Sequence, residues 1–196
     1  NDTDLANDMR LASNEEFIPD DHLVDPRLDW TVGRRGIPFF DWGVMRGADW
    51  IRDQNNGGPY LYKKNMFYKS QKGTLSTSTG WATGVNANNY RAYRYAHVLL
   101  WRAEVAVEEN DLEMARNLVN IIRRRASNSV VMGRVTDYTL PPGEHSDEFQ
   151  EANGTIDWNM PAANYLVSEY ESFPDQEYAR RAVQWELRLE FAMEGH

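Results

Sequence analysis

Four aromatic residues in a stretch rich in Gly, Asn and Pro have the chemistry needed to bind a sugar: Trp42, Trp50, Tyr60 and Trp81. One face of a pyranose ring presents C–H groups, so a Trp or Tyr ring can lie against it while neighbouring amides and carboxylates hydrogen-bond the hydroxyl groups. The polar residues closest to these rings in the sequence are Asp49, Arg52, Asn55, Asn56 and Asn86. We expect at least one of the four rings to contact a ligand. The alternative for each single ring is that it anchors the loop to the rest of the protein.

The carboxylates and histidines are not arranged in a way that favours catalysis. A glycosidase needs two carboxylates at a fixed separation. Glu15–Glu16 and Asp20–Asp21 are instead neighbours in a polar stretch, which is typical of a solvated loop. The four histidines are scattered, and neither a Gly-x-Ser-x-Gly elbow nor a His-Glu-x-x-His pair occurs. We therefore predict that the protein is not an enzyme.

No metal ion or cofactor is predicted from the sequence either. The chain holds no cysteine, which excludes a disulfide, a zinc–thiolate site and a thiol nucleophile. Residues 53–57 resemble the start of an EF-hand loop, but the twelfth position, which needs an acidic residue, is Lys64. A calcium site built from loop carbonyl groups is left open.

Charge and hydropathy exclude two further classes. The formal net charge of −9 argues against nucleic acid as a partner, because such proteins carry a basic stripe. The basic run at residues 123–125 falls in the last turn of a predicted helix, where it complements the helix dipole. No apolar run is long enough to span a bilayer.

The candidate rings lie on residues 37–88, which are predicted to be long and irregular because Gly, Asn and Pro interrupt them throughout. A long irregular segment within a compact domain is usually functional when it is ordered. This segment is therefore where we expect a binding site.

Residues 89–127 show apolar residues at helical spacing, which predicts two antiparallel helices joined by the short turn Asn110–Asp111. Asp111 is expected to cap the second helix, and His97 to lie on the polar, outward side of the first. The small residues match a tetratricopeptide unit in part, and an ordinary helical hairpin is the alternative. The residues expected to face inward are Ala92, Tyr95, Ala96, Leu99, Ala103 and Ala106 in the first helix, and Leu112, Ala115, Val119, Ile122 and Ala126 in the second.

The patterns elsewhere in the chain are shorter. Alternation at residues 28–32 predicts a short strand, residues 127–159 read as a loop with a brief helix at 145–151, and residues 161–172 read as extended. Residues 174–194 are predicted to form a helix. Its expected inner stripe is Tyr178, Ala182, Trp185, Leu189 and Ala192, widened by Val183 and Leu187. Three other tryptophans are assigned mainly to structure: Trp101, Trp158 and Trp185.

Four segments, taken in order, resemble the C-terminal half of the SusD/RagB family. They begin at Asp25, Lys63, Asn89 and Ser172 and read DPRLDWTVGRRGIPFFDWG, KKNMFYKSQ, NYRAYRYAHVLLWRAEVAVEENDLEMARNLVNIIRRRA and SFPDQEYARRAVQWELRLEFAMEGH. Each segment is short, but their order makes the resemblance specific.

This resemblance implies an all-α fold on a tetratricopeptide-like helical scaffold, SusD-like, with long irregular loops that carry the ligand surface. It implies that residues 1–196 are part of a single SusD/RagB-like domain, its C-terminal half truncated at both ends. It also implies a lipid-anchored, surface-facing protein of the outer membrane of Bacteroidota. The implied ligand is an oligosaccharide or polysaccharide, and the implied partner is a SusC-like TonB-dependent transporter. Sites in the family vary in position, so no site residue is carried over by motif.

Glycan binding is therefore the expected function, and protein binding is the alternative. The first is non-catalytic glycan binding for nutrient uptake. The second is a helical-repeat scaffold that binds another protein and has no sugar site of its own. The surface expected for this second function is the outer face of the helical pair, with Arg94, His97, Trp101, Glu104 and Glu108.

Overall fold

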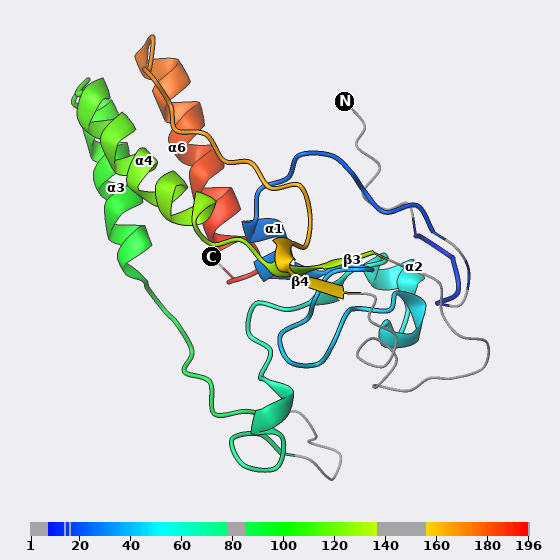
Figure 1. Ribbon diagram of the computed structural model, residues 1–196. Coiled ribbons are helices and arrows are strands. Elements are labelled where there is room, and N and C mark those ends of the chain that lie inside the picture. Colours follow the sequence, from blue (N-terminus) through cyan, green and yellow to red (C-terminus); the bar gives the residue numbers. More distant parts are fainter. Residues whose placement is uncertain (1–7, 14, 16, 78–84, 137–155, 196) are drawn as a thin grey trace. The chain divides into compact units, whose positions relative to one another are not determined.

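A computed structural model describes residues 8–13, 15, 17–77, 85–136 and 156–195 (Figure 1). The chain divides into two compact units. Unit 1 is formed by the described residues up to 23 together with 29–89 and 131–164, and unit 2 by residues 24–28, 90–130 and 165 onward.

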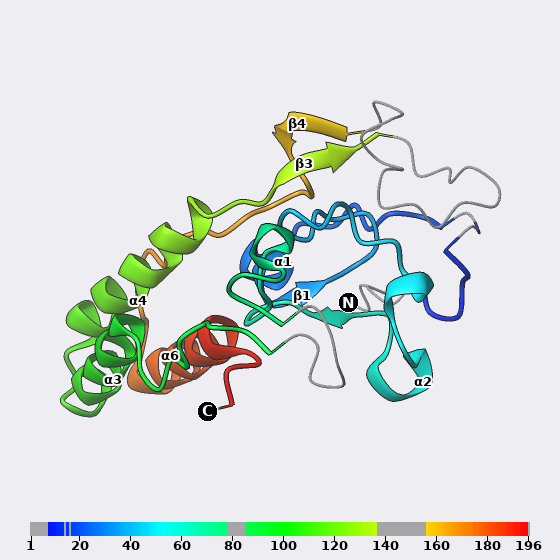
Figure 2. The same ribbon diagram turned by 90° about the horizontal axis from the view of Figure 1, so that it is seen from below.

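Unit 2 contains three long helices: α3 (Tyr95–Glu108), α4 (Leu112–Ser127) and α6 (Gln176–Phe191). The helices lie side by side in both views (Figures 1 and 2). Small side chains allow this close approach, since Ala103, Ala106, Ala115 and Val119 are all fully buried between them. The helical pair predicted for residues 89–127 is thus confirmed, although its first helix begins only at Tyr95. Ala92 and Tyr95, which were expected to face inward, are exposed because they precede or begin this helix.

Side-chain caps set the starts of two of these helices. The Asp111 carboxylate accepts a hydrogen bond of 3.0 Å from the Met114 N–H, as predicted. Asp175 does the same for α6, accepting from the Tyr178 N–H at 2.7 Å. Each cap satisfies a backbone donor that has no partner within its helix. The predicted final helix is therefore confirmed, with its start at Gln176.

The face that α6 buries agrees only in part with the predicted one. Tyr178 and Trp185 were expected inside, but 36% and 58% of their surfaces are exposed. Ala182 and Val183 are buried as expected, and the other buried side chains are Ala179, Glu186, Glu190 and Phe191. The prediction was wrong because it treated carboxylates as outward-facing, whereas here two of them are buried against arginines.

Unit 1 is built largely from irregular chain with two small sheets. The first sheet pairs β1 (Val32–Gly33) with β2 (Leu61–Tyr62), antiparallel. The second pairs β3 (Met132–Val135) with β4 (Ile156–Pro161), also antiparallel and with a shift of register beside Met132 (Figure 2). Short helical turns complete the unit: η1 (Ala48–Trp50), α2 (Gln54–Gly57) and η2 (Lys69–Gln71). The irregular character predicted for residues 37–88 is confirmed over its described part.

Two local predictions were wrong. Residues 28–31 were expected to be a strand but belong to helix α1 (Arg27–Thr31). Asp25 caps this helix by accepting a hydrogen bond from the Arg27 N–H at 2.9 Å, and Pro26 is favourable at the start of a helix. Residues 127–159 were expected to be a loop but contain β3 and part of β4. The two strands pair across a long stretch of sequence, so no short hairpin signal marks them. The helix expected at residues 145–151 lies outside the described residues.

The regular structure is thus mostly helical, with two small antiparallel sheets, rather than all-α. In the part of the chain that the structure describes, no helix combines the length and the apolar character needed to cross a membrane.

Candidate functional site

The centre of unit 1 is a tight turn at residues 39–43. The Phe39 N–H donates to the Gly43 carbonyl at 2.8 Å, and the Trp42 N–H donates to the Phe39 carbonyl at 3.0 Å. This turn forces Phe40 to a φ of 52°. A bulky side chain is rarely found in this left-handed region, which costs on the order of 1–3 kcal/mol. The turn therefore holds one aromatic ring in a strained but defined position.

Asp41, at the tip of this turn, binds the segment that carries η2. Its carboxylate accepts hydrogen bonds from the Lys69 N–H at 2.5 Å and the Ser70 N–H at 2.9 Å. Burial raises the pKa of Asp41, but the hydrogen bonds from Ser70 and Lys69 outweigh it, and the net effect is a lowered pKa. The carboxylate is thus ionised at neutral pH and caps η2 from the neighbouring turn.

Trp42 makes a second connection to the same segment. Its indole Nε1–H donates to the Phe67 carbonyl at 2.8 Å, and its ring meets the Phe67 ring edge-on at 5.6 Å between centroids. Trp42 is half-buried. Its N–H is already engaged within the protein, so a ligand could use only the remaining ring surface.

The other predicted ring positions lie elsewhere in unit 1. Trp50 ends η1 and packs edge-on against Phe39, with 6.0 Å between ring centroids. Tyr60 directly precedes β2 and is half-buried. Trp42 and Trp50 are therefore held by different neighbours. Trp81 lies outside the described residues.

The polar residues expected near these rings are partly engaged in local structure. The Asp49 N–H donates a hydrogen bond to the Ser13 hydroxyl oxygen at 2.8 Å. Asn55 and Asn56 lie in the short helix α2 and are exposed, as is Arg52 just before it. The exposed groups are available for hydrogen bonds to a ligand.

Lys63 was not singled out in the sequence, yet it is the buried centre of this region. Its side chain is almost fully buried, and its Nζ donates to the carbonyls of Asp29 at 2.6 Å and Pro38 at 2.8 Å. Burial lowers the pKa of Lys63 to about 8, although the nearby Asp29 carboxylate opposes this effect. The ammonium also lies over three rings, at 5.2 to 5.5 Å from their centroids: Trp30, Phe39 and Phe40. Such cation–π contacts compensate in part for the lost hydration.

Unit 2 holds a buried ionic network on the inner face of α6. The Glu190 carboxylate accepts from Arg94 at 2.7 Å, from Arg125 at 2.6 Å and from Arg27 at 3.3 Å. Glu186 accepts from Arg27 at 2.5 Å and from Arg123 at 3.1 Å. Burial raises the pKa of Glu190, but the hydrogen bonds and charges of Arg94 and Arg125 outweigh it, so the pKa is lowered. The network joins the Asp-Pro-Arg segment at residues 25–27 to all three long helices of the unit.

Two residues expected on the outer face of the helical pair are turned inward. His97 is only 3% exposed, and its ring stacks on Phe191 with 3.6 Å between centroids. Arg94 pairs with Glu190 and Glu194. Both predictions were wrong, because the face of α3 that meets α6 includes these polar residues. A hollow of about 670 Å³ opens beside His97 and is lined by Tyr93, Trp101, Leu187, Arg188, Phe191 and Met193.

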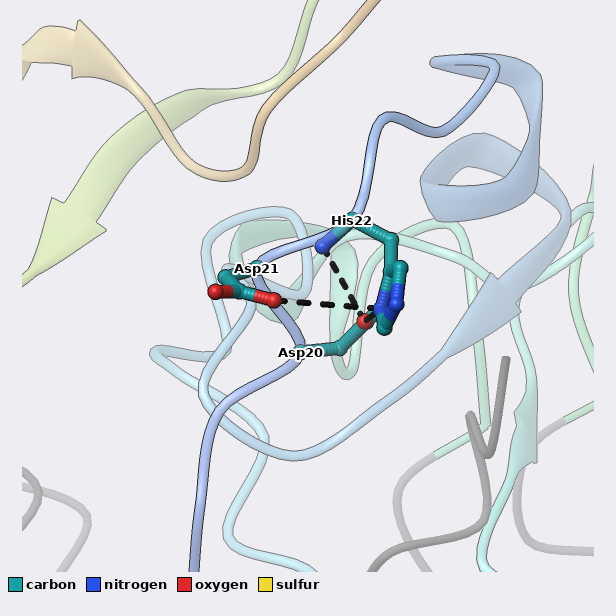
Figure 3. Close-up of side chains that lie close together, drawn as sticks. All are labelled: Asp20, Asp21 and His22. Carbon is teal, nitrogen blue, oxygen red and sulfur yellow. Dashed lines mark hydrogen bonds and ion pairs between the residues drawn. The ribbon is translucent and has the colours of Figure 1, made fainter. Parts of the chain in front are cut away.

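Asp20, Asp21 and His22 form a group whose possible metal-binding atoms, the carboxylate oxygens and a ring nitrogen, lie within 4.8 Å of one another (Figure 3). The buried Asp20 carboxylate accepts from the His22 backbone N–H at 3.2 Å and faces His22 Nδ1 at 2.5 Å (Figure 3). Its second oxygen lies 3.6 Å from the Arg34 guanidinium. The interactions of Asp20 therefore fit a local turn whose buried charge is balanced by arginine. The adjacent carboxylates do not share a cleft, because the Asp21 side chain is 93% exposed.

Comparison with known proteins extends this picture. The family model described as "SusD family" matches residues 10–196, which is nearly the whole chain. The search of curated proteins found no match.

Proposed function

The chain belongs to the SusD family, and from that premise we propose that it captures glycans, without chemical turnover, for nutrient uptake. The observation that carries the proposal is the family match over residues 10–196. Members of this family are carbohydrate-binding, non-catalytic proteins of nutrient uptake that work with a transporter, and they are typically lipoproteins associated with the outer membrane.

The finer parts of the proposal concern partner and place. The transporter would be SusC-like and TonB-dependent, and the protein would face outward from the outer membrane of a member of the Bacteroidota through a lipid anchor. The net charge of −9 agrees with a partner that is not nucleic acid. We also propose that residues 89–127 form a tetratricopeptide-like helical pair and that the chain is part of a single SusD-like domain.

We place the glycan surface on the irregular segment at residues 37–88, with Trp42, Trp50, Tyr60 and Trp81 as candidate contacts. The half-burial of Trp42, Trp50 and Tyr60 supports this choice, because each ring is held by the protein and keeps part of its surface exposed. Rings of this kind bind at a low cost in conformational entropy. Asn55 and Asn56 on the exposed α2 would supply hydrogen bonds to hydroxyl groups.

The test is calorimetric titration of the chain with soluble glycans, which should cover α- and β-linked glucans, xylans, mannans, galactans, arabinans, fructans and N-glycans. Saturable binding to one class without release of reducing ends is expected. Each of the four candidate rings is then replaced by Ala. If no glycan binds, the proposed function is wrong. If binding occurs and all four variants keep the wild-type affinity, the function stands and the choice of residues is wrong.

A second candidate function, binding of another protein by the helices, is favoured by one observation. Val98, Trp101 and Val105 form an exposed apolar stripe on α3, with 52%, 44% and 47% of their surfaces exposed. Their spacing puts them on one face of the helix. Trp101→Glu is expected to reduce co-purification with a SusC-like transporter and to leave glycan affinity unchanged. Unchanged co-purification would argue against this second function.

A further inference from the structure

We propose that Trp158, on the β3–β4 sheet of unit 1, is a platform on which a sugar ring stacks. The inference rests on the proposed glycan-binding function and adds to it a contact outside residues 37–88. The sequence assigns Trp158 mainly to structure, but 52% of its surface is exposed. What holds the ring and what surrounds it both favour a role in binding.

The sheet is irregular at the position of Trp158. The pairing shifts between the two strands, so that Gly133 of β3 alone lies opposite residues 158–160 of β4 (Figure 2). Extra residues in one strand form a bulge, which bends that strand and redirects its side chains. Residues 158–160 are all exposed, whereas a regular strand turns successive side chains to opposite faces. The bulge therefore presents Trp158 to solvent.

Gly133 makes room for the Trp158 ring. Its φ is 108°, a conformation that residues with a side chain rarely adopt. A Cβ at this position would lie 2.7 and 2.8 Å from two carbons of the six-membered ring of Trp158, Cζ3 and Cε3. The ring therefore packs directly against the glycine backbone, as aromatic residues do where they cover a glycine of a neighbouring strand. This contact gives an exposed ring a defined position, which reduces the entropy lost on binding.

Pro38 connects this contact to the segment at residues 37–88. A Cβ on Gly133 would also lie 2.9 Å from the Pro38 Cγ, so the Pro38 and Trp158 rings meet the same stretch of backbone. Pro38 is itself fixed, because its carbonyl accepts a hydrogen bond from the Lys63 Nζ at 2.8 Å. Trp158 therefore lies beside the segment on which the other candidate contacts were placed.

The remaining surface of Trp158 is open to a ligand. Among the residues that the structure describes, no other aromatic ring and no cationic group stacks on Trp158. Trp42 and Trp50, by contrast, each pack edge-on against a phenylalanine. Trp158 thus has more free ring surface than these two candidates.

Hydrogen-bonding groups flank Trp158 in the chain. The Asp157 carboxylate accepts a hydrogen bond from the Asn159 N–H at 2.9 Å, which fixes the backbone on both sides of the ring. Asn159 is exposed, and its side-chain amide makes no hydrogen bond within the described part of the chain. An amide both donates and accepts, as a sugar hydroxyl group does. An aromatic ring beside such a group matches the C–H face and the hydroxyl edge of a pyranose.

The experiment is calorimetric titration with the same panel of glucans, xylans, mannans, galactans, arabinans, fructans and N-glycans. For the glycan that binds the wild type, Trp158→Ala is expected to raise Kd on the order of tenfold or more, the effect of losing a central aromatic contact. Trp158→Phe keeps a ring and should retain most of the affinity, while the change in tryptophan fluorescence on binding becomes smaller. Trp185→Ala is the matched control, because Trp185 on α6 is 58% exposed and is expected to leave Kd unchanged.

Two further variants keep Trp158 and change what surrounds it. Gly133→Ala places a methyl group where the ring lies, so it is expected to displace the ring and to weaken binding. Asn159→Ala removes only an exposed amide and keeps the N–H bond to Asp157. It is expected to raise Kd by about twofold to tenfold, the effect of losing one hydrogen bond. Circular dichroism establishes that each variant is folded.

The outcomes distinguish this inference from the proposed function. Wild-type affinity in folded Trp158→Ala would overturn the platform and leave the proposed function intact. If that variant instead loses only its co-purification with a SusC-like transporter, Trp158 and the exposed Met132 and Met160 form a protein contact, and the inference is wrong. If Trp158→Ala does not fold, wild-type affinity in Asn159→Ala with an unchanged fluorescence response in Trp158→Phe overturns it. A wild-type chain that binds no glycan of the panel overturns both.

Discussion

Arg94 and Glu190 form a buried ion pair, with 2.7 Å between Arg94 Nη1 and Glu190 Oε1, although 96 residues of sequence separate them. The Glu190 side chain is only 2% exposed, and Arg125 also donates to it. Removing one member of a buried ionic network leaves the other charges without compensation. This is more destabilising than replacing the whole network by well-packed apolar residues. The inner face of α6 therefore depends on this carboxylate.

Glu190→Gln is accordingly expected to lower the free energy of unfolding by about 3–5 kcal/mol, as measured by urea denaturation followed by far-UV circular dichroism. Glu177→Gln on the same helix is the control. Glu177 pairs with Arg181 at 2.5 Å, but both side chains are well exposed, and such pairs contribute only about 0.3–0.5 kcal/mol. Equal effects of the two substitutions would show that the buried network contributes no more than a surface ion pair.

The same carboxylate predicts a dependence on acid. The pKa of Glu190 is lower in the folded state than the ordinary value of 4.5. Its contribution is therefore fully present above pH 4.5 and is lost as the pH falls through the lowered value, because the unfolded chain binds the proton first. Wild type should lose stability more steeply than Glu190→Gln below pH 4.5. Parallel curves would mean that other groups carry the acid sensitivity.

Gly33 is predicted to be intolerant of even a methyl group. A Cβ at this position would lie 2.6 Å from a carbon of the Phe39 ring, and Phe39 is buried with little room to move. Gly33→Ala should lower the free energy of unfolding by about 1–3 kcal/mol through overpacking. Gly57→Ala is the matched control, since a Cβ there meets nothing within 4 Å, and it should be neutral or stabilising. A neutral Gly33→Ala would show that the Phe39 ring can shift.

The helical pair could be predicted from sequence because its information is local. Ala103, Ala106, Ala115 and Val119 recur at helical spacing and are all buried, and the Asp111 cap acts within one turn of its own position. Elements of this kind need no knowledge of the rest of the chain.

The inner face of α6 could not be predicted in the same way. Its pattern favours Trp185 inside and Glu190 outside, and the structure has the reverse. What reverses it is a set of arginines from other elements, among them Arg27 and Arg94, that neutralise the buried carboxylates. Periodicity within one helix carries no information about such distant partners.

The contact between Phe40 and Tyr68 could not be predicted for a related reason. Tyr68 comes next to Phe40 because Asp41 binds the backbone of residues 69 and 70. Trp30, whose ring also lies near Phe40, is part of helix α1, at residues that were predicted to form a strand. The sequence signal that could have suggested it is the strained turn around Phe40, but the residues at its centre, Phe-Asp, are not those usually seen in turns with a positive φ.

Lys63 predicts a dependence on alkaline pH. Its pKa is about 8 in the folded state and 10.5 in the unfolded state. Between these values the unfolded chain binds more protons, so the unfolding free energy rises with pH. The gain attributable to Lys63 is up to about 3 kcal/mol, from 1.36 kcal/mol per pKa unit. This gain in unfolding free energy with pH should be absent in Lys63→Met. If the stability difference between wild type and this variant does not change from pH 8 to 10.5, the buried ammonium is not destabilising.

Trp42→Phe separates the two roles considered for Trp42. The substitution keeps an aromatic ring but removes the hydrogen bond from Nε1–H to the Phe67 carbonyl, which measures 2.8 Å. Loss of this bond leaves the carbonyl of the buried residue Phe67 without its donor and should lower the free energy of unfolding by about 1–2 kcal/mol. If the Trp42 ring stacks on a sugar, Trp42→Phe should keep most of the glycan affinity and Trp42→Ala should lose it. Equal affinity in both variants, with the same loss of stability, would instead assign Trp42 to anchoring residues 67–70, which carry Tyr68.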